Sequence, residues 1–412
     1  MFSNIVRGII DVNLPYDAIA SKHKRKKKLK EPMKIIYIKN KITISILVVV
    51  LSATTNFFAQ NKQGVKSVNY LDFSWKKVAT QMPEEWYGSD EAKLVAENVL
   101  LNQNEIGGWA KNRPYHHALT EAEKSQITKD KTGIGSTFDN GATITEMMFL
   151  AKVYGKIKDE RYRNSFMQAL EYILKAQYAN GGWSQFFPFR KGKSVDYASH
   201  ITYNDNAMVN VLMLLNDIVK EKVIYTHMQI SSLMKAKAKK SFDKGIECIL
   251  KTQIVVDDKP TVWCAQHDEF TLLPAKARSY ELPSFSGFES VGITLLLMEI
   301  ENPTREIISA VNGAVEWFEK NKIEGIKLVP VDQQEGKDDM IVKEDKTAPA
   351  VWARFYDLET GKPFFSDRDG IKKNTLAEIG YNRRSGYNWY TDKPEKVLET
   401  YPVWAKKYVI KN

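Results

Sequence analysis

Two short acidic motifs contain the residue types that bind calcium. The motifs FDNGAT at 138–143 and ITYNDNAM at 201–208 each precede a helical pattern, and they supply Asp139 and Asp205. Calcium takes hard oxygen ligands, so two carboxylates on one rim favour a calcium site. Neither motif resembles an EF-hand loop, and the ion would therefore be shared with a substrate. The alternative is that each aspartate only caps the helix that follows it.

A long polar loop, Trp263–Ser290, holds a second set of reactive residues. Lys276, Arg278 and Glu281 lie in it, near two prolines that disfavour a continuous helix. Polar loops of this length inside a compact domain usually carry function. Arg278 is therefore a candidate catalytic residue, and a structural ion pair with Glu281 is the alternative.

Most of the net charge of +10 lies at the start of the chain. Residues 1–59 hold eleven Lys or Arg and three acidic residues, a net of +8, which leaves about +2 for residues 60–412. Because the main body is nearly neutral, its composition argues against nucleic-acid and membrane partners. Arginines interleaved with aromatic residues at 352–390 also suit a sugar chain that bears uronates.

The first 59 residues are typical of a targeting segment. From Met33 the order is that of a signal peptide, with lysines, the apolar run Ile42–Leu51 and small residues up to Ala59. The run is too short to span a bilayer. We expect translation to begin at Met33 and the protein to be secreted, extracellular or periplasmic, with a membrane anchor or basic arm as the alternative.

Only two cysteines, Cys248 and Cys264, occur in the chain. This number excludes a disulfide-stapled scaffold and leaves one bridge open. Cys264 and His267 have the spacing of half a zinc site, but no second pair follows at a suitable distance, which argues against zinc.

A long internal repeat indicates the fold. Gln103, Gln177 and Gln253 recur at spacings of 74 and 76 residues, and each ends a helical pattern and precedes a loop with a tryptophan. Such a period is typical of stacked helical hairpins. Helices are expected at 92–102, 143–154, 159–178, 206–221, 232–252, 289–301 and 304–321, with Gly155 as a stop after the second of them.

These patterns predict a mainly α fold, a helical hairpin toroid of (α/α)3-like type, over residues 91–325. Residues 60–90 are expected to wrap it. Residues 326–412 are expected to form a small mixed strand and loop region that completes the substrate groove, with two short strands within 351–368. The alternative is an irregular helical bundle with scattered loops.

The combined motifs resemble the pectate lyases of polysaccharide lyase family ten. The matching runs are FDNGAT at 138, GGWSQFFP at 181, ITYNDNAM at 201, TVWCAQHD at 261, PAKARSYELPS at 274 and WARFYDLETGKPFFSDRDG at 352, over roughly residues 70–400. Position 184 is Ser, where the family often has Pro. The resemblance implies a secreted monomer that cleaves α-1,4-polygalacturonate by calcium-assisted anti β-elimination.

The resemblance also implies roles for individual residues. Asp139 and Asp205 correspond to calcium-associated carboxylates, Arg278 to the catalytic base, and Arg354 or Arg368 to a clamp on a substrate carboxylate. The tryptophans of the repeat loops have two interpretations that are equally open: they stack on sugar rings, or they fill the core. The candidate substrate-binding residues are Asn140, Lys276, Arg354, Arg368, Trp183 and Tyr203.

The chemistry leaves alternatives open. Arginine is normally protonated, so it acts as a base only if its surroundings disfavour the charge; otherwise it stabilises the enolate while hydroxide takes the proton. A glycoside hydrolase with Asp205 and Glu281 as acid and base is the main rival. A sugar-binding protein without activity is a third possibility, although the motifs are intact.

Overall fold

The computed structural model describes residues 69–132, 135–190, 192–332 and 338–409. Residues Val68–Asn412 belong to one compact unit. The predicted targeting segment, 1–59, lies outside the described residues. Within the described part, no helix is long and apolar enough to cross a membrane.

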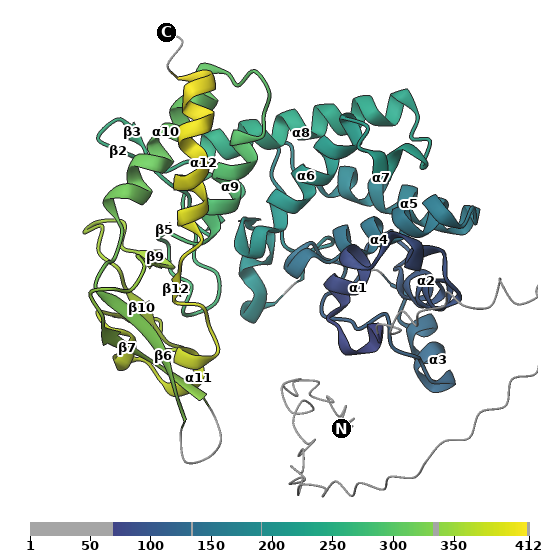
Figure 1. The fold of residues 1–412 in the computed structure, drawn as a ribbon, viewed down its shortest axis with the longest axis horizontal. Helices are drawn as coiled ribbons and strands as arrows, with labels where there is room; N and C mark the ends of the chain where they lie inside the picture. The colour runs from purple at the N-terminus through teal and green to yellow at the C-terminus, as the bar shows by residue number, and fades with distance from the viewer. Residues whose placement is uncertain (1–68, 133–134, 191, 333–337, 410–412) are drawn as a thin grey trace, which may run out of the picture. The chain divides into compact units, whose positions relative to one another are not determined.

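Three helical hairpins follow one another along the chain (Figure 1). They are α4 (Ile144–Lys156) with α5 (Glu160–Ala176), α6 (Ala207–Val219) with α8 (Ser232–Thr252), and α9 (Glu289–Met298) with α10 (Arg305–Lys320). The helix α2 (Asp90–Asn102) precedes them and packs against α4 and α5. The mainly α, (α/α)3-like prediction is confirmed, although α4 runs through Gly155 instead of stopping there.

The helices begin where the sequence supplies caps. The side chains of Asp159, Ser231 and Thr304 each accept a hydrogen bond from a backbone N–H in the first turn of α5, α8 and α10. Such bonds satisfy amides that the start of a helix otherwise leaves unpaired. The buried positions of α5 recur every three or four residues, so one face packs on the core and the other faces water.

The glutamines of the repeat connect neighbouring hairpins. Gln103 donates from Nε2 to the carbonyl of Ser165 at 2.9 Å, and the Ser165 hydroxyl donates back to Gln103 Oε1 at 2.6 Å. Gln177 makes the same exchange with Ser241 one hairpin further on. Gln253 donates to the carbonyl of Ala310 at 2.9 Å. The period of the sequence is therefore the period of these buried links.

The tryptophans of the repeat fill the core. Trp109, Trp183 and Trp263 are fully buried, and each indole N–H donates to a helix carbonyl at 2.7–2.9 Å. A buried indole keeps its donor satisfied in this way. The core-plug alternative is correct for all three residues.

The remaining elements are short. Before the hairpins lie η1 (Tyr70–Asp72), α1 (Trp75–Gln81), η2 (Glu84–Gly88), α3 (Glu121–Lys129) and η3 (Asp139–Gly141). Between the first and second hairpins lie η4 (Lys193–Ser199) and η5 (Asn204–Asn206), and α7 (Val223–Thr226) lies within the second hairpin. The strands before residue 300 are β1 (Ile201–Thr202), β2 (Val255–Val256), β3 (Lys259–Pro260), β4 (Gln266–His267) and β5 (Phe285–Ser286). β1 pairs with β4, and β5 pairs with β9 (Phe355–Tyr356) of the C-terminal region; both pairs are antiparallel.

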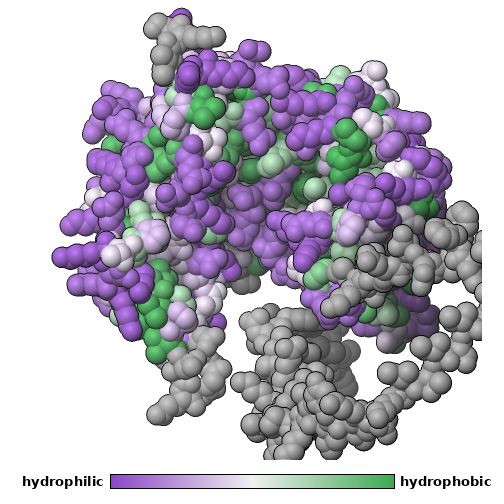
Figure 2. All heavy atoms as spheres, viewed as in Figure 1, coloured by the Kyte–Doolittle hydropathy of each residue, from purple (hydrophilic) through white to green (hydrophobic). Residues whose placement is uncertain are grey.

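The C-terminal region contains both strands and helices. Its elements are β6 (Ile326–Asp332), β7 (Asp338–Glu344), β8 (Trp352–Ala353), β9 (Phe355–Tyr356), β10 (Phe365–Ser366), β11 (Lys372–Lys373), η6 (Leu376–Glu378), α11 (Tyr381–Ser385), β12 (Tyr390–Thr391) and α12 (Pro394–Tyr408). The sequence interpretation missed α12, which packs against α9 and α10. The face seen in Figure 1 is largely hydrophilic, with smaller hydrophobic areas (Figure 2).

Candidate active site

The two aspartate motifs fold into matching turns before α4 and α6. In η3 the residue Asn140 has φ 53°, and in η5 the residue Asp205 has φ 50°. Apart from glycine, asparagine and aspartate are the residues that most often adopt this left-handed region. The backbone therefore makes Asp205 equivalent to Asn140, and Asp139 equivalent to Asn204.

This register corrects the expectation that the two aspartates occupy equivalent positions. The turns η3 and η5 contact each other, which keeps both aspartates on one rim. Neither aspartate caps its helix, because the N-cap positions of α4 and α6 are Thr143 and Asn206. The capping alternative is therefore wrong for both.

Asp139 is a buried carboxylate with one satisfied oxygen. Its Oδ2 forms an ion pair with the Lys111 ammonium. Its Oδ1 is buried and has no hydrogen-bond partner in the described part of the chain. Burying such an oxygen is costly unless a cation or donor meets it.

Asp205 lies beside a buried ion pair. Arg354 donates from Nη2 to Glu289 and to Asn204 Oδ1, and the latter bond is 3.1 Å long. Asn204 in turn donates to Asp205 at 2.8 Å, and Arg354 Nη2 lies 3.9 Å from Asp205. Burial opposes the charge on Arg354, but Glu289 outweighs it and raises the pKa of the guanidinium.

Arg278 is held by Glu281 within the loop 263–290. Its Nε donates to Glu281 Oε2 at 2.8 Å, and its Nη2 donates to Oε1. The Tyr387 hydroxyl donates to the same carboxylate at 2.9 Å. Burial opposes the charge on Arg278, but the bonds from Glu281 outweigh it and raise the pKa of Arg278. The ion pair with Glu281 is therefore present, and the Arg383 guanidinium lies on the same Tyr280 ring as that of Arg278, at 3.7 and 4.8 Å from its centre. Together these surroundings favour the charged form of Arg278.

Tyr387 joins the two arginine sites. The Arg354 guanidinium lies 4.4 Å from the centre of the Tyr387 ring, and that of Arg278 lies 5.8 Å from it. Bonds and ring contacts thus connect Arg278 with Asp205.

The other predicted binding residues divide into exposed and buried ones. Asn140, Lys276 and Arg368 are exposed and can contact a ligand. Trp183 and Tyr203 are 0% exposed, so their expected contact with sugar is corrected to a core role.

Sequence reasoning missed several partners of these residues. Glu289, Tyr387, Asn204 and Lys111 hold the predicted site residues in place, as described above. Asn204 follows directly from the repeat, because it aligns with Asp139 once the turns are superposed. Tyr387 lies 106 residues from its partner Glu281, and Glu289 lies 65 residues from its partner Arg354. No local sequence pattern indicates pairings over such distances.

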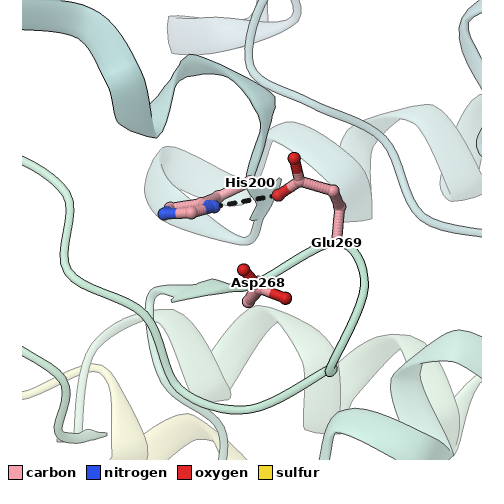
Figure 3. A group of neighbouring side chains, drawn as sticks. All are labelled: His200, Asp268 and Glu269. Atoms are coloured by element: carbon pink, nitrogen blue, oxygen red, sulfur yellow. Dashed lines mark hydrogen bonds and ion pairs between the residues drawn. The ribbon is translucent and has the colours of Figure 1, made fainter. Parts of the chain in front are cut away.

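A separate cluster of His200, Asp268 and Glu269 lies at the start of the loop Trp263–Ser290, which we call the active loop (Figure 3). His200 Nδ1 lies 3.0 Å from Glu269 Oε2, and Asp268 lies near both. One oxygen of Asp268 accepts hydrogen bonds from the backbone of Phe270 and from Thr271. Beside the cluster, β1 pairs with β4, so it ties the segment that leads to Asp205 to the loop that carries Arg278.

The cysteine expectations also have structural answers. Cys248 and Cys264 are both free and buried. His267 accepts a hydrogen bond from the Cys264 backbone N–H at 3.2 Å, and its other ring nitrogen lies 2.9 Å from the Leu272 carbonyl. The Cys264 and His267 spacing therefore reflects a local backbone brace.

Two of three comparisons with known proteins gave matches. The family model described as pectic acid lyase matches residues 103–398. A solved family 10 polysaccharide lyase from Cellvibrio cellulosa is 34% identical, with a TM-score of 0.65, and the match covers 79% of this chain and 96% of that one. An aspartate-to-alanine mutant of a family 10 polysaccharide lyase from the same organism, in complex with trigalacturonic acid, is 32% identical, with a TM-score of 0.66 and coverages of 81% and 95%. A search of curated proteins found no match.

The family match covers most of the described chain and includes both aspartate turns, the active loop and the C-terminal arginines. The similarity to the solved lyases extends over almost their whole length. The chain is therefore a polysaccharide lyase and belongs to the pectate lyases of family ten.

Proposed function

We propose that this protein is a secreted, monomeric pectate lyase that cleaves α-1,4-polygalacturonate by calcium-assisted anti β-elimination, with Arg278 as the base. The observation that carries the proposal is the continuous link from Arg278 through Glu281, Tyr387, Arg354 and Asn204 to Asp205. It connects the loop that bears Arg278 with the turn that bears Asp205, and η3, which bears Asp139, contacts that turn. A related lyase in complex with trigalacturonic acid supports the substrate class.

The residues at the rim fit calcium. The buried Oδ1 of Asp139 has no partner in the described residues, and Asp205 is 37% exposed in its side chain. Both are hard oxygen donors, and waters and the substrate carboxylate would complete a coordination of six to eight. A bound calcium ion would withdraw charge from the substrate carboxylate and stabilise the developing enolate.

The cluster His200, Asp268 and Glu269 is a poorer calcium site, although its three ligand atoms converge. One of the three is a nitrogen, whereas calcium prefers oxygen. The Oδ1 of Asp268 already accepts three hydrogen bonds. We therefore assign calcium to the rim of Asp139 and Asp205.

Arg278 would remove the proton from C5 of the galacturonate. Glu281 holds Nε and Nη2, so Nη1 is left to face a sugar, on a side chain that is 43% exposed. Because the ion pair raises the pKa of Arg278, only a small fraction of the guanidine is neutral at any working pH. The rate should therefore rise steadily as the pH increases.

The exposed cations suit the substrate better than the buried one. Arg354 is 3% exposed and is committed to Glu289 and Asn204, so it positions Asp205 and does not clamp a sugar. Lys276 and Arg368 are exposed, and the Lys276 ammonium lies beside Gly370 in the Arg368 loop. We assign the carboxylate clamp to these two residues, and we assign Asn140, which follows Asp139 directly, to substrate binding as well.

The glycoside hydrolase alternative uses Asp205 and Glu281 as acid and base. As the base, Glu281 would need a free carboxylate oxygen, but both of its oxygens accept hydrogen bonds from Arg278. As the acid, it would have to hold a proton. Burial alone would raise the pKa of Glu281, but bonds from Arg278 and Tyr387 outweigh it and lower the pKa. A carboxyl with a lowered pKa is unsuited to a general acid.

The test is an assay on polygalacturonate with added calcium and with excess chelator. We expect products that absorb in the ultraviolet through a new double bond, and a loss of this activity in chelator that calcium restores. Saturated products with new reducing ends, or full activity in chelator, would contradict the proposal.

Secretion has its own test. The protein should be expressed from Met33 in a bacterial host, and the recovered protein should be sequenced from its N-terminus. We expect it outside the cytoplasm, starting at Gln60 after removal of the segment that ends at Ala59. An intact N-terminus on cytoplasmic protein would exclude the signal peptide.

A further inference from the structure

A pocket of about 380 Å³ with both polar and apolar walls lies between α1, α4 and the segment 110–114. We call it the Trp75 pocket; its polar lining includes Trp75, Lys76, Asn112, Arg113, Asn140 and Glu146. Its volume lies within the range of about 300–1,000 Å³ for small-molecule sites. None of the steps described above uses it, apart from the placement of Asn140.

Glu146 gives this pocket a buried polar group that the protein does not satisfy. The residue is 1% exposed, and its Oε1 accepts a hydrogen bond from Trp75 Nε1 at 2.6 Å. Its Oε2 is buried without a partner in the described part of the chain. Such an oxygen destabilises the fold unless a donor meets it, so its presence at a pocket points to a ligand with hydroxyl groups.

The other walls of the pocket offer complementary chemistry. Trp75 is partly exposed and presents an aromatic ring, which suits the apolar face of a sugar. Lys76 and Arg113 are exposed cations at the rim, and an arginine can bind a carboxylate with two parallel hydrogen bonds. A hydroxylated ring with a carboxylate matches all three features.

The pocket adjoins the proposed calcium rim through two segments of chain. Asn140 follows Asp139 directly, and its amide donates to Asn112 Oδ1 at 2.9 Å. Lys111 pairs with Asp139, while its neighbours Asn112 and Arg113 line the pocket. A polymer whose uronate lies at Asp139 can therefore extend over Asn140 into the pocket.

A second surface pocket of similar volume shows the contrast. It is lined by β3 and α10, including Arg305 and Asn312. The described residues that line it include no buried unpartnered polar atom, and Asn312 accepts a hydrogen bond from Tyr401 at 2.9 Å. Its lining residues are far in sequence from both aspartate turns, and none of the described residues that line it is aromatic.

We propose that the Trp75 pocket is an outlying subsite for a galacturonate residue of the substrate chain. In it, Arg113 and Lys76 bind the uronate carboxylate and Glu146 accepts a hydrogen bond from a sugar hydroxyl. This assignment rests on the proposed polygalacturonate lyase function and adds a source of chain-length preference to it.

The test compares kcat/KM on trigalacturonate and on hexagalacturonate with calcium present. Arg113→Ala removes an exposed cation and should not disturb the fold, and Glu146→Gln keeps the shape of the side chain. We expect each variant to lose about tenfold more on hexagalacturonate than on trigalacturonate. The matched control, Arg305→Ala, removes an exposed arginine from the second pocket and should leave both values at the wild-type level.

The outcomes separate this proposal from the proposed function. Wild-type activity on trigalacturonate tests the lyase itself, whereas only the ratio between the two substrates tests the subsite. An equal loss on both substrates, or no loss in Arg113→Ala, would overturn the subsite. As a second readout, hexagalacturonate should bind the slowed Arg278→Ala variant about tenfold more weakly when Arg113→Ala is added, and unchanged binding would also overturn it.

Discussion

Arg278 and Glu281, three residues apart in the active loop, form a two-point ion pair that holds the guanidinium by its Nε and Nη2 atoms. This contact fixes the direction of the side chain and raises its pKa. Orientation is therefore provided at the expense of the fraction of Arg278 that is neutral and can accept a proton. Neutral arginine acting as base, and charged arginine acting with hydroxide, both predict a rate that rises about tenfold per pH unit.

Replacing Arg278 by lysine and by alanine distinguishes these two roles. Lysine has an ordinary pKa of about 10.4, and its pH profile should level off near that value in both cases, because the base must be neutral and the helper of hydroxide must be charged. Alanine can do neither, so its slower rate should still rise with pH if hydroxide is the base, and should depend little on pH if Arg278 is the base. We expect the levelling in Arg278→Lys, and in Arg278→Ala a rate about 10²–10⁴-fold below wild type that depends little on pH. Initial rates of product absorbance over the alkaline range measure both, and Arg161→Lys, an exposed arginine on α5, is the control.

Calcium affinity should depend on the two aspartates. Asp139→Asn and Asp205→Asn each remove one negative charge from the rim, so each should raise the calcium concentration that gives half-maximal rate by at least tenfold. Asp243→Asn, an exposed aspartate on α8, should leave it unchanged. Half-maximal calcium values within twofold of wild type in both rim variants would exclude the site.

The buried pair of Arg354 and Glu289 should matter for stability more than an exposed one. Arg354→Met leaves the Glu289 carboxylate buried without its cation, so we expect a loss of about 3–5 kcal/mol in the free energy of unfolding. Adding Glu289→Gln to that variant should recover part of it. Urea unfolding measures both. The control Arg161→Met breaks exposed ion pairs and should lower the free energy of unfolding by less than about 1 kcal/mol. A loss in Arg354→Met that is no larger than the loss in this control would contradict the expectation.

The sequence predicted the helices well because they repeat a local pattern. The limits of α8 were predicted at both ends, since Ser231 caps its start and Gln253 follows its end. The helix α12 was missed because few of its residues are buried, and aromatic and charged residues between them obscure the helical pattern. Its buried face packs on α9 and α10, which lie far away in sequence.

The candidate site was predicted in part for the same reason. Motifs identified Asp139, Asp205 and Arg278, which lie on locally determined turns. Motifs could not reveal that Trp183 and Tyr203 are buried, because a tryptophan after two glycines fits a core and a sugar groove equally well. Nor could they indicate Tyr387, which contacts Glu281 across 106 residues.

Glu146 predicts an unusual pH dependence of stability. Burial raises its pKa from 4.5 to about 7, against the opposing hydrogen bond from Trp75. The folded protein therefore binds this proton more tightly than the unfolded chain does. The stabilisation is fully present below pH 4.5 and is lost as the pH rises through about 7. Glutamine resembles the protonated acid at every pH, so the advantage of Glu146→Gln over wild type should grow between these limits.

The growth should be on the order of 3 kcal/mol, because each pKa unit corresponds to about 1.4 kcal/mol and Glu146 is 1% exposed. Urea unfolding at pH 4.5 and pH 8 measures it as the change in the stability difference between the two proteins. Glu171→Gln, an exposed glutamate on α5, is the matched control and should show no comparable change. If the stability difference between Glu146→Gln and wild type is the same at both pH values, water solvates the Glu146 Oε2 atom in the free protein. The Trp75 pocket would then contain no buried acceptor that needs a hydrogen bond from a ligand.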